Sequence, residues 1–194
     1  MIRLLSAPSA TLIAALALLT ASAGGASAQM MFDFTGTSHN SYLGRSSPIA
    51  RTTVIFPTRY ARGTVVISTG ERRLYLVLGG GQALSYGIGV GRDGFRWGGV
   101  HRISAKKEWP EWTPPSQMLA RRPDLPRHMR GGIENPLGAR ALYLGSTLYR
   151  IHGSNEPETI GQAVSSGCFR MTNEDVTDLY GRVPVGATVV VLNN

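Results

Sequence analysis

Short stretches of strand-forming residues, separated by glycine-rich turns, limit what this chain can fold into more than any other feature of its sequence. The three stretches are Thr64–Ser68, Arg73–Leu78 and Ala83–Val90. They are rich in valine, isoleucine, leucine and tyrosine, and turns at Thr69-Gly70 and Gly79–Gly81 separate them. Short segments of this composition, joined by tight turns, pair with their neighbours in sequence. The sequence therefore predicts a mainly β domain that contains an antiparallel meander.

The second half of the chain continues this pattern and adds one helix. Three further strands are predicted, over Ala141–Leu144, Leu148–Ile151 and Ala187–Leu192. Thr172 and Asp175 fit a capping box, and apolar residues follow at helical spacing, which predicts a helix from about Asn173 to Arg182. A short helical turn is expected within Glu158–Val164, because it follows a proline.

The N-terminal residues have the pattern of a secretory signal peptide. Arg3 gives a positive start, Leu12–Leu19 is apolar, and Ala26–Ala28 has the small residues of a cleavage site. The apolar run is too short to span a membrane, so the mature form is predicted to have no transmembrane segment. The alternative, a core helix at the N-terminus, is disfavoured by the glycine and alanine residues that follow Leu19. Cleavage after Ala28 would release the protein into the periplasm.

The remaining chain is long enough for one domain with a sizeable core. Removal of the signal peptide leaves 166 of the 194 residues, and 42% of the whole chain is hydrophobic. Three parts are therefore predicted: a signal peptide over 1–28, an extension or linker over 29–58, and a single domain over 59–194. Within the extension, Val54–Phe56 could add an edge strand to the domain.

The chain is basic, which bears on its partners. Lysine and arginine number 20 and the acidic residues 12, giving a net charge of +8, or +7 once Arg3 is lost with the signal peptide. Nucleic acid is not an expected partner of an exported protein. Anionic polymers or membrane surfaces outside the cytoplasm fit the charge, and so does a simple contribution to solubility. The glycine-rich stretch Tyr86–Gly94 lacks the lysine and the following helix of a phosphate-binding loop.

The only cysteine, Cys168, lies in a run that could support nucleophilic catalysis. A Ser-Ser-Gly sequence precedes it, Arg170 follows, and His152 lies upstream at the end of a predicted strand. A cysteine nucleophile needs a base to take its proton and backbone amides to hold the developing oxyanion, and a glycine such as Gly167 lets a backbone approach the substrate closely. A lone cysteine is otherwise often a small buried hydrophobe, and a lone histidine is often structural. Zinc binding is disfavoured because no ligand pattern accompanies them.

A long connection starts at Trp109 and is predicted to be mostly irregular. It contains three prolines near Trp112 and then four arginines, Arg121, Arg122, Arg127 and Arg130. One interpretation is a cover over an active site, with tryptophans lining it and arginines receiving carboxylates. An equally good interpretation is a surface loop held in place by tryptophan packing.

The stretch around Cys168 resembles the catalytic motif of the L,D-transpeptidase (YkuD-type) family of bacterial cell-wall enzymes. That motif runs His-Gly, a spacer, then Ser-His-Gly-Cys, an apolar residue and Arg. The matching residues here are His152, Gly153, Ser165, Ser166, Gly167, Cys168, Phe169 and Arg170. The resemblance extends back to Asn135–Gly145 and forward through Tyr180. One residue departs from the motif, because Ser166 stands where the family has histidine.

The resemblance implies a fold, an activity and a set of site residues. The fold would be a β-sandwich of mixed sheets with a few short helices and a long loop over the active site. The protein would be a cysteine-dependent acyltransferase that needs no metal or organic cofactor. Its donor would be a peptidoglycan stem peptide, and its acceptor a second stem peptide or an outer-membrane protein or lipoprotein, as in cell-wall biogenesis.

The resemblance also implies individual roles. Cys168 would be the nucleophile, His152 the proton donor and acceptor, and Gly153 the residue whose carbonyl orients His152. The amides of Ser166, Gly167 and Cys168 would hold the oxyanion. Two further residues are candidates for substrate contact: Arg170, for which bracing of the loop is the alternative, and Tyr149, for which a place in the core is the alternative.

Three other functional classes remain open at this point. A hydrolase of the same fold, a carboxypeptidase or endopeptidase, would use the same residues with water as acceptor. A non-catalytic wall-binding module would explain the charge and export, but not the pairing of Cys168 with His152. A papain-like protease is disfavoured because its cysteine precedes its histidine in the sequence, whereas the order here is reversed.

Overall fold

The computed structural model describes residues 46–194. The predicted signal peptide and most of the predicted extension lie outside these residues, so the predicted domain boundaries remain expectations. In the part of the chain that is described, no helix has the length and apolar character needed to cross a membrane.

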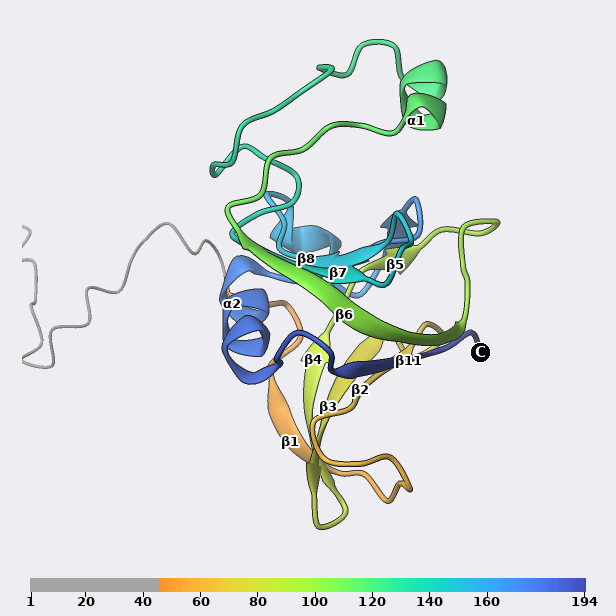
Figure 1. Cartoon of the computed structure of the whole chain (residues 1–194), viewed down its shortest axis with the longest axis vertical. Coiled ribbons are helices and arrows are strands. Elements are labelled where there is room, and N and C mark those ends of the chain that lie inside the picture. Colours follow the sequence, from red (N-terminus) through yellow and green to blue (C-terminus); the bar gives the residue numbers. More distant parts are fainter. Residues whose placement is uncertain (1–45) are drawn as a thin grey trace, which may run out of the picture. The chain divides into compact units, whose positions relative to one another are not determined.

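The predicted antiparallel meander is present (Figure 1). It comprises β2 (Val65–Ser68), β3 (Arg73–Gly79) and β4 (Gln82–Gly87), each paired antiparallel with the next. β1 (Thr52–Ile55) pairs with β4 and forms the edge of the sheet, which confirms the edge strand expected near Val54.

One strand prediction in this region is wrong. The segment Ala83–Val90 was expected to form a single strand, but β4 ends at Gly87 and Val90 belongs to a separate short strand, β5 (Val90–Gly91). Between them, Gly89 forms an antiparallel bridge with Arg170. The chain therefore leaves the meander at Gly87 and crosses to the segment that contains Cys168. Local composition cannot show this change of partner, because the residues before and after Gly87 are equally suited to a strand, whether it pairs with β3 or with the segment around Arg170.

A long strand, β6 (Gly99–Glu108), joins two sheets into a sandwich of mixed sheets, as expected. Its first residues pair with β11 (Thr188–Leu192), and its later residues pair with β7 (Arg140–Leu144). The strands of this continuous arrangement follow the order β1-β4-β3-β2-β11-β6-β7-β8-β10, where β8 is Arg150–His152 and β10 is Phe169–Arg170. Figure 1 shows β6 between β11 and β7, and β7 is followed by β8, which carries His152. Both pairing directions occur, since β11 is parallel to β2 and antiparallel to β6.

The remaining elements follow the predictions closely. β8 (Arg150–His152) pairs antiparallel with β7 and parallel with β10 (Phe169–Arg170). The helix α2 (Asn173–Arg182) begins where expected, and the Thr172 side chain accepts a hydrogen bond from the Asp175 amide. The predicted helical turn is only a 3₁₀ turn, η2 (Pro157–Thr159), and β9 (Ala163–Ser165) follows it in parallel pairing with β5.

The hydrophobic core lies between the two sheets and under α2, and it determines which way the site residues face. Its fully buried members include Val65, Leu74, Tyr86, Leu142, Ile151 and Phe169. Successive side chains of a strand point to opposite faces of the sheet. Because Ile151 and Phe169 point into the core, their neighbours His152 and Cys168 face the other side.

Candidate active site

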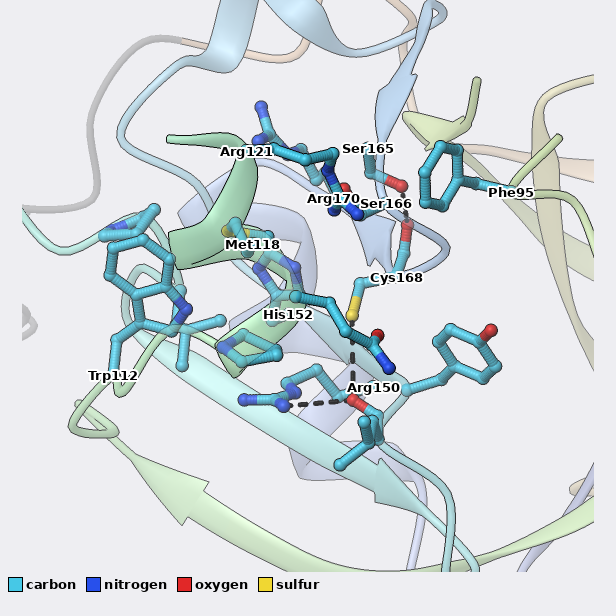
Figure 2. A pocket seen from close by; sticks show the side chains of 16 residues that line it. Phe95, Trp112, Met118, Arg121, Arg150, His152, Ser165, Ser166, Cys168 and Arg170 are labelled. Atoms are coloured by element: carbon cyan, nitrogen blue, oxygen red, sulfur yellow. Dashed lines mark hydrogen bonds between the residues drawn. The ribbon is translucent and has the colours of Figure 1, made fainter. Parts of the chain in front are cut away.

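A cavity of about 320 Å³ brings the candidate catalytic residues together (Figure 2). Its wall includes His152, Cys168 and Arg170 from the strands, and Trp112, Met118 and Arg121 from the long connection. Cys168 is partly accessible and is therefore not simply a buried hydrophobe. His152 and Cys168, which are sixteen positions apart in the sequence motif, thus line the same concave site.

The parallel pairing of β8 with β10 explains why these residues meet. Phe169 lies opposite Ile151 and Arg170 lies opposite His152. Continuing this register by one residue puts Cys168 beside Arg150. The thiol therefore lies next to the strand that carries the histidine, and the backbone of both partners is held by sheet hydrogen bonds.

The ring of His152 is held in one tautomer. Its Nδ1 lies 2.6 Å from the carbonyl oxygen of Gly153, and the residue is buried. Because a carbonyl oxygen can only accept, Nδ1 carries the proton, and Nε2 of the neutral ring keeps its lone pair. Burial, together with the positive charges of Arg170 and Arg150, lowers the pKa of His152 to about 3. The imidazole is therefore neutral at physiological pH.

The thiol of Cys168 is neutral at physiological pH. Burial raises its pKa, and the nearby Arg150 and Arg170 oppose this effect. Its Sγ lies 4.0 Å from the carbonyl oxygen of Leu148, which also accepts a hydrogen bond of 3.0 Å from the Arg150 guanidinium (Figure 2). Two neutral groups, the Cys168 thiol and the His152 imidazole, thus face the cavity.

Arg150 was missed by sequence reasoning. Among the influences that lower the pKa of Cys168, the charge of Arg150 comes first, and the Arg150 guanidinium donates to the same Leu148 carbonyl oxygen that the thiol approaches. The sequence does contain a clue, because Arg150 lies two residues before His152 and alternate residues of a strand share a face.

The loop that carries Cys168 is closed by its own hydrogen bonds. Ser165 Oγ donates to the Cys168 carbonyl oxygen at 2.6 Å and accepts from the Gly167 amide at 3.1 Å. Gly167 was expected to share in holding an oxyanion, but in this structure its N–H is already used by Ser165. Among the hydrogen bonds of residues 46–194, none is donated by the backbone amide of Ser166 or by that of Cys168. These two amides are the remaining candidates for the oxyanion site.

The two candidates for substrate contact lie on the cavity wall. Arg170 Nη1 is 2.7 Å from Glu156 Oε2. This ion pair is compatible with the interpretation in which Arg170 braces the loop. Tyr149 stacks on Trp97 with ring centroids 4.4 Å apart and packs against the core. Its ring also reaches the cavity, so its two proposed roles are compatible in space.

A side chain that the motif did not mark, Asn173, holds the histidine segment in place. Its Oδ1 accepts from the Ala139 amide at 2.9 Å and from the Ser154 amide at 3.2 Å. A Cβ on Gly153 would collide with this oxygen, so only glycine fits between His152 and Asn173. The first residue of α2 thereby fixes the carbonyl that orients His152.

The long connection contributes to the cavity wall rather than lying elsewhere on the surface. Figure 1 shows it rising from the end of β6 and carrying the short helix α1 (Ser116–Arg121). Trp112 pairs with Met129 through two backbone hydrogen bonds of 2.8 Å, and the buried Asn135 side chain donates to the carbonyl oxygens of Pro110 and Arg130. The loop is thus held at its base by Asn135, and its far part covers one side of the cavity.

Comparisons with known proteins agree with this site. Residues 62–191 match the family model of the L,D-transpeptidase catalytic domain, YkuD. The chain is 37% identical over 144 residues to the probable L,D-transpeptidase YbiS of Escherichia coli K12, covering 70% of this chain and 46% of that protein. It is 34% identical over 149 residues to the probable L,D-transpeptidase ErfK/SrfK of the same strain, covering 72% and 47%. The chain therefore spans about half the length of these curated relatives.

Solved structures give the same fold. L,D-transpeptidase 3 from Mycobacterium tuberculosis matches with a TM-score of 0.55 at 17% identity, covering 67% of this chain and 60% of that one. A Brucella melitensis crystal structure, described as a probable carnitine operon oxidoreductase, is 46% identical with a TM-score of 0.51, covering 79% and 99%. The family-model match extends over most of the described domain and contains both His152 and Cys168. On this evidence, the chain belongs to the L,D-transpeptidase family.

Proposed function

We propose that this protein is a periplasmic L,D-transpeptidase that acts on peptidoglycan stem peptides through a thioester on Cys168. The observation that carries the proposal is the shared cavity of Cys168 and His152, in which Nδ1–H of His152 donates to Gly153 and leaves Nε2 able to take the thiol proton. The predicted signal peptide supports export. The relatives named as probable L,D-transpeptidases support the reaction class.

The first half-reaction forms the acyl-enzyme. Cys168 Sγ attacks the carbonyl carbon of the diamino-acid residue in a donor tetrapeptide while His152 Nε2 takes the thiol proton. The amides of Ser166 and Cys168 donate to the oxyanion that develops. When the tetrahedral intermediate collapses, the bond to D-alanine breaks and His152 returns the proton to its amine. A thioester remains on Cys168.

The second half-reaction transfers the acyl group. An acceptor amine attacks the thioester, His152 takes a proton from that amine, and the thiol is regenerated. An amine from a second stem peptide gives a cross-link, whereas an amine of an outer-membrane protein or lipoprotein gives an attachment to the wall. Water as acceptor would make the enzyme a carboxypeptidase or endopeptidase with the same residues.

The charges around the cavity fit an anionic peptide substrate. Arg121 lies in the cavity wall, and Arg150 and Arg170 lie beside the thiol. Stem peptides carry free carboxylates, which guanidinium groups bind well. Both strand arginines also favour the thiolate over the thiol, so they assist the attack after the proton has moved to His152.

The name of the Brucella relative suggests an oxidoreductase, but a dinucleotide site, which many oxidoreductases use, has little support from residues 46–194. Dinucleotide sites place the pyrophosphate at the N-terminus of a helix that follows a glycine-rich turn. Here the glycine-rich segment Tyr86–Gly94 forms the end of β4, β5 and a turn, and the next regular element is β6. It therefore offers no helix N-terminus to a pyrophosphate.

The test is the intact mass of the mature protein after incubation with a disaccharide-tetrapeptide, with and without an amine acceptor, followed by analysis of the released products. Release of D-alanine with formation of a cross-linked product, lost in Cys168→Ala, would support transpeptidation. Release of D-alanine with only the tripeptide accumulating would identify a carboxypeptidase. Absence of both acyl-enzyme and turnover would favour the wall-binding module.

A further inference from the structure

Two carbonyl groups of the Cys168 loop are held by one distant segment, Gly91–Trp97, which begins at the last residue of β5 and ends before β6. The Arg92 amide donates to the Ser165 carbonyl oxygen at 3.1 Å. The Trp97 indole Nε1–H donates to the Gly167 carbonyl oxygen at 2.7 Å. We call Gly91–Trp97 the brace segment. It contains the end of the glycine-rich stretch for which sequence analysis found no function.

The two bonds determine where the neighbouring amides point. A trans peptide is planar, and its C=O and N–H point in opposite directions. No cis peptide occurs among the described residues. Fixing the Ser165 carbonyl therefore fixes the Ser166 N–H, and fixing the Gly167 carbonyl fixes the Cys168 N–H. These are the two amides left without a protein partner after Ser165 has taken the Gly167 amide.

We infer that the brace segment sets the direction of the two oxyanion donors, and that Trp97 is the positioning residue for the Cys168 amide. The inference rests on the proposed acyl-transfer function of Cys168. Trp97 does not line the cavity and touches no reacting atom, so it acts only through the Gly167–Cys168 peptide.

Trp97 is itself held firmly enough to orient a peptide. Its ring stacks on Tyr149 at 4.4 Å with an interplanar angle of 11°, and it packs against Phe169 at 5.3 Å. Such aromatic contacts fix both the position and the tilt of the indole. The hydrogen bond to the Gly167 oxygen is therefore made by a ring that has little freedom to turn.

Glycine at position 91 lets the brace segment approach the Cys168 loop. A Cβ there would lie 2.5 Å from the Phe95 carbonyl oxygen and 3.3 Å from Gly167 Cα. The turn is closed by a hydrogen bond of 2.9 Å from the Phe95 amide to the Arg92 carbonyl oxygen. A side chain at this position would have to push the two loops apart.

A positioning role for Trp97 makes a specific kinetic prediction, because two reactions of the same thiol differ in their need for oxyanion donors. Acylation by p-nitrophenyl acetate passes through a tetrahedral oxyanion, transfers the acetyl group to Sγ and releases p-nitrophenolate. Alkylation by iodoacetamide displaces iodide from carbon and forms no oxyanion. Only the first reaction should depend on the direction of the Cys168 amide.

The experiment compares both rates in the mature wild-type protein and in Trp97→Phe, which keeps an aromatic ring but removes the indole N–H. Acylation is expected to slow about 10-fold, less than the roughly 10²–10³-fold loss on removing a donor itself. Alkylation should stay within about 2-fold of wild type. Tyr75→Phe is the matched control, because it also keeps an aromatic ring and removes its hydrogen-bond donor, here the hydroxyl that donates to Glu71. Tyr75 lies on β3 and does not line the cavity, so this change should leave both rates unchanged.

Equal rates in Trp97→Phe and wild type, or a parallel loss of acylation and alkylation, would overturn the inference. Gly91→Ala is the second variant and should show the same selective loss of acylation, because it displaces the brace segment without removing the indole. The test does not depend on the physiological substrate. If the wild-type protein is acylated by the ester but releases no D-alanine from stem peptides, the proposed function fails and the positioning inference stands.

Discussion

Replacing Gly167 with alanine should destabilise the fold and disable the site together, and a second glycine provides the control. Gly167 has φ of +111°, a conformation that side chains rarely adopt, and a Cβ there would overlap the Tyr149 ring. The strained backbone costs about 1–3 kcal/mol and the overlap about 1–3 kcal/mol, so the free energy of unfolding should fall by about 2–6 kcal/mol. That is a large share of the roughly 5–15 kcal/mol typical of a domain.

Gly181 lies within α2 and has nothing within 4 Å of its ideal Cβ position. Alanine there should stabilise the protein by about 0.5–1 kcal/mol, because alanine is the better helix former. Urea unfolding of the two variants measures the contrast, and ester acylation of Cys168 measures the site. If Gly167→Ala were as stable as wild type, the positive φ and the packing against Tyr149 would not constrain this loop as described.

Three further predictions concern single side chains around the site. The pKa of His152 is lowered to about 3 in the fold, so between about pH 6.5 and 3 the unfolded chain binds one more proton than the folded chain. The free energy of unfolding, measured in urea, should therefore decrease as the pH is lowered through that range, and it should decrease less in His152→Gln. Arg150→Gln should move the pH midpoint of Cys168 alkylation by iodoacetamide upward, because a charge that favours the thiolate is lost; an unchanged midpoint would argue against this role. Asn173→Ala should lower the free energy of unfolding by about 2–4 kcal/mol in the same urea assay, because two buried amides lose their acceptor, whereas Asn173→Asp keeps an acceptor and should lose less.

Local patterns predicted the meander, the edge strand, β7, β8, β11 and α2, but not the long strand β6, nor α1, β9 and β10. The strand-forming runs at Val65–Ile67 and Leu74–Leu78 became β2 and β3, and the capping pattern at Thr172 gave the start of α2 correctly. These features depend on residues within a few positions of one another. The turn of the chain after Gly87 was not predicted, because Gly89 pairs with Arg170, which is distant in the sequence.

The candidate nucleophile and base were also readable, but their surroundings were not. The sequence motif named Cys168 and His152, while the register of β8 against β10, which brings Arg150 beside the thiol, comes from a parallel pairing that no local pattern encodes. Trp97 is a stronger example. Its indole contacts a carbonyl seventy residues away, and nothing in its own neighbourhood distinguishes it from an ordinary core aromatic.

The place of β11 in the sheet has a consequence for the order in which the protein can fold. The strand Thr188–Leu192 lies between β2 and β6 and pairs with both. Until this segment has been synthesised, the meander has an open edge at β2, and β6 has no partner on that side. Contacts between residues so far apart in sequence slow folding. The site around Cys168 is therefore complete only after β11, which connects the meander to β6, has been synthesised.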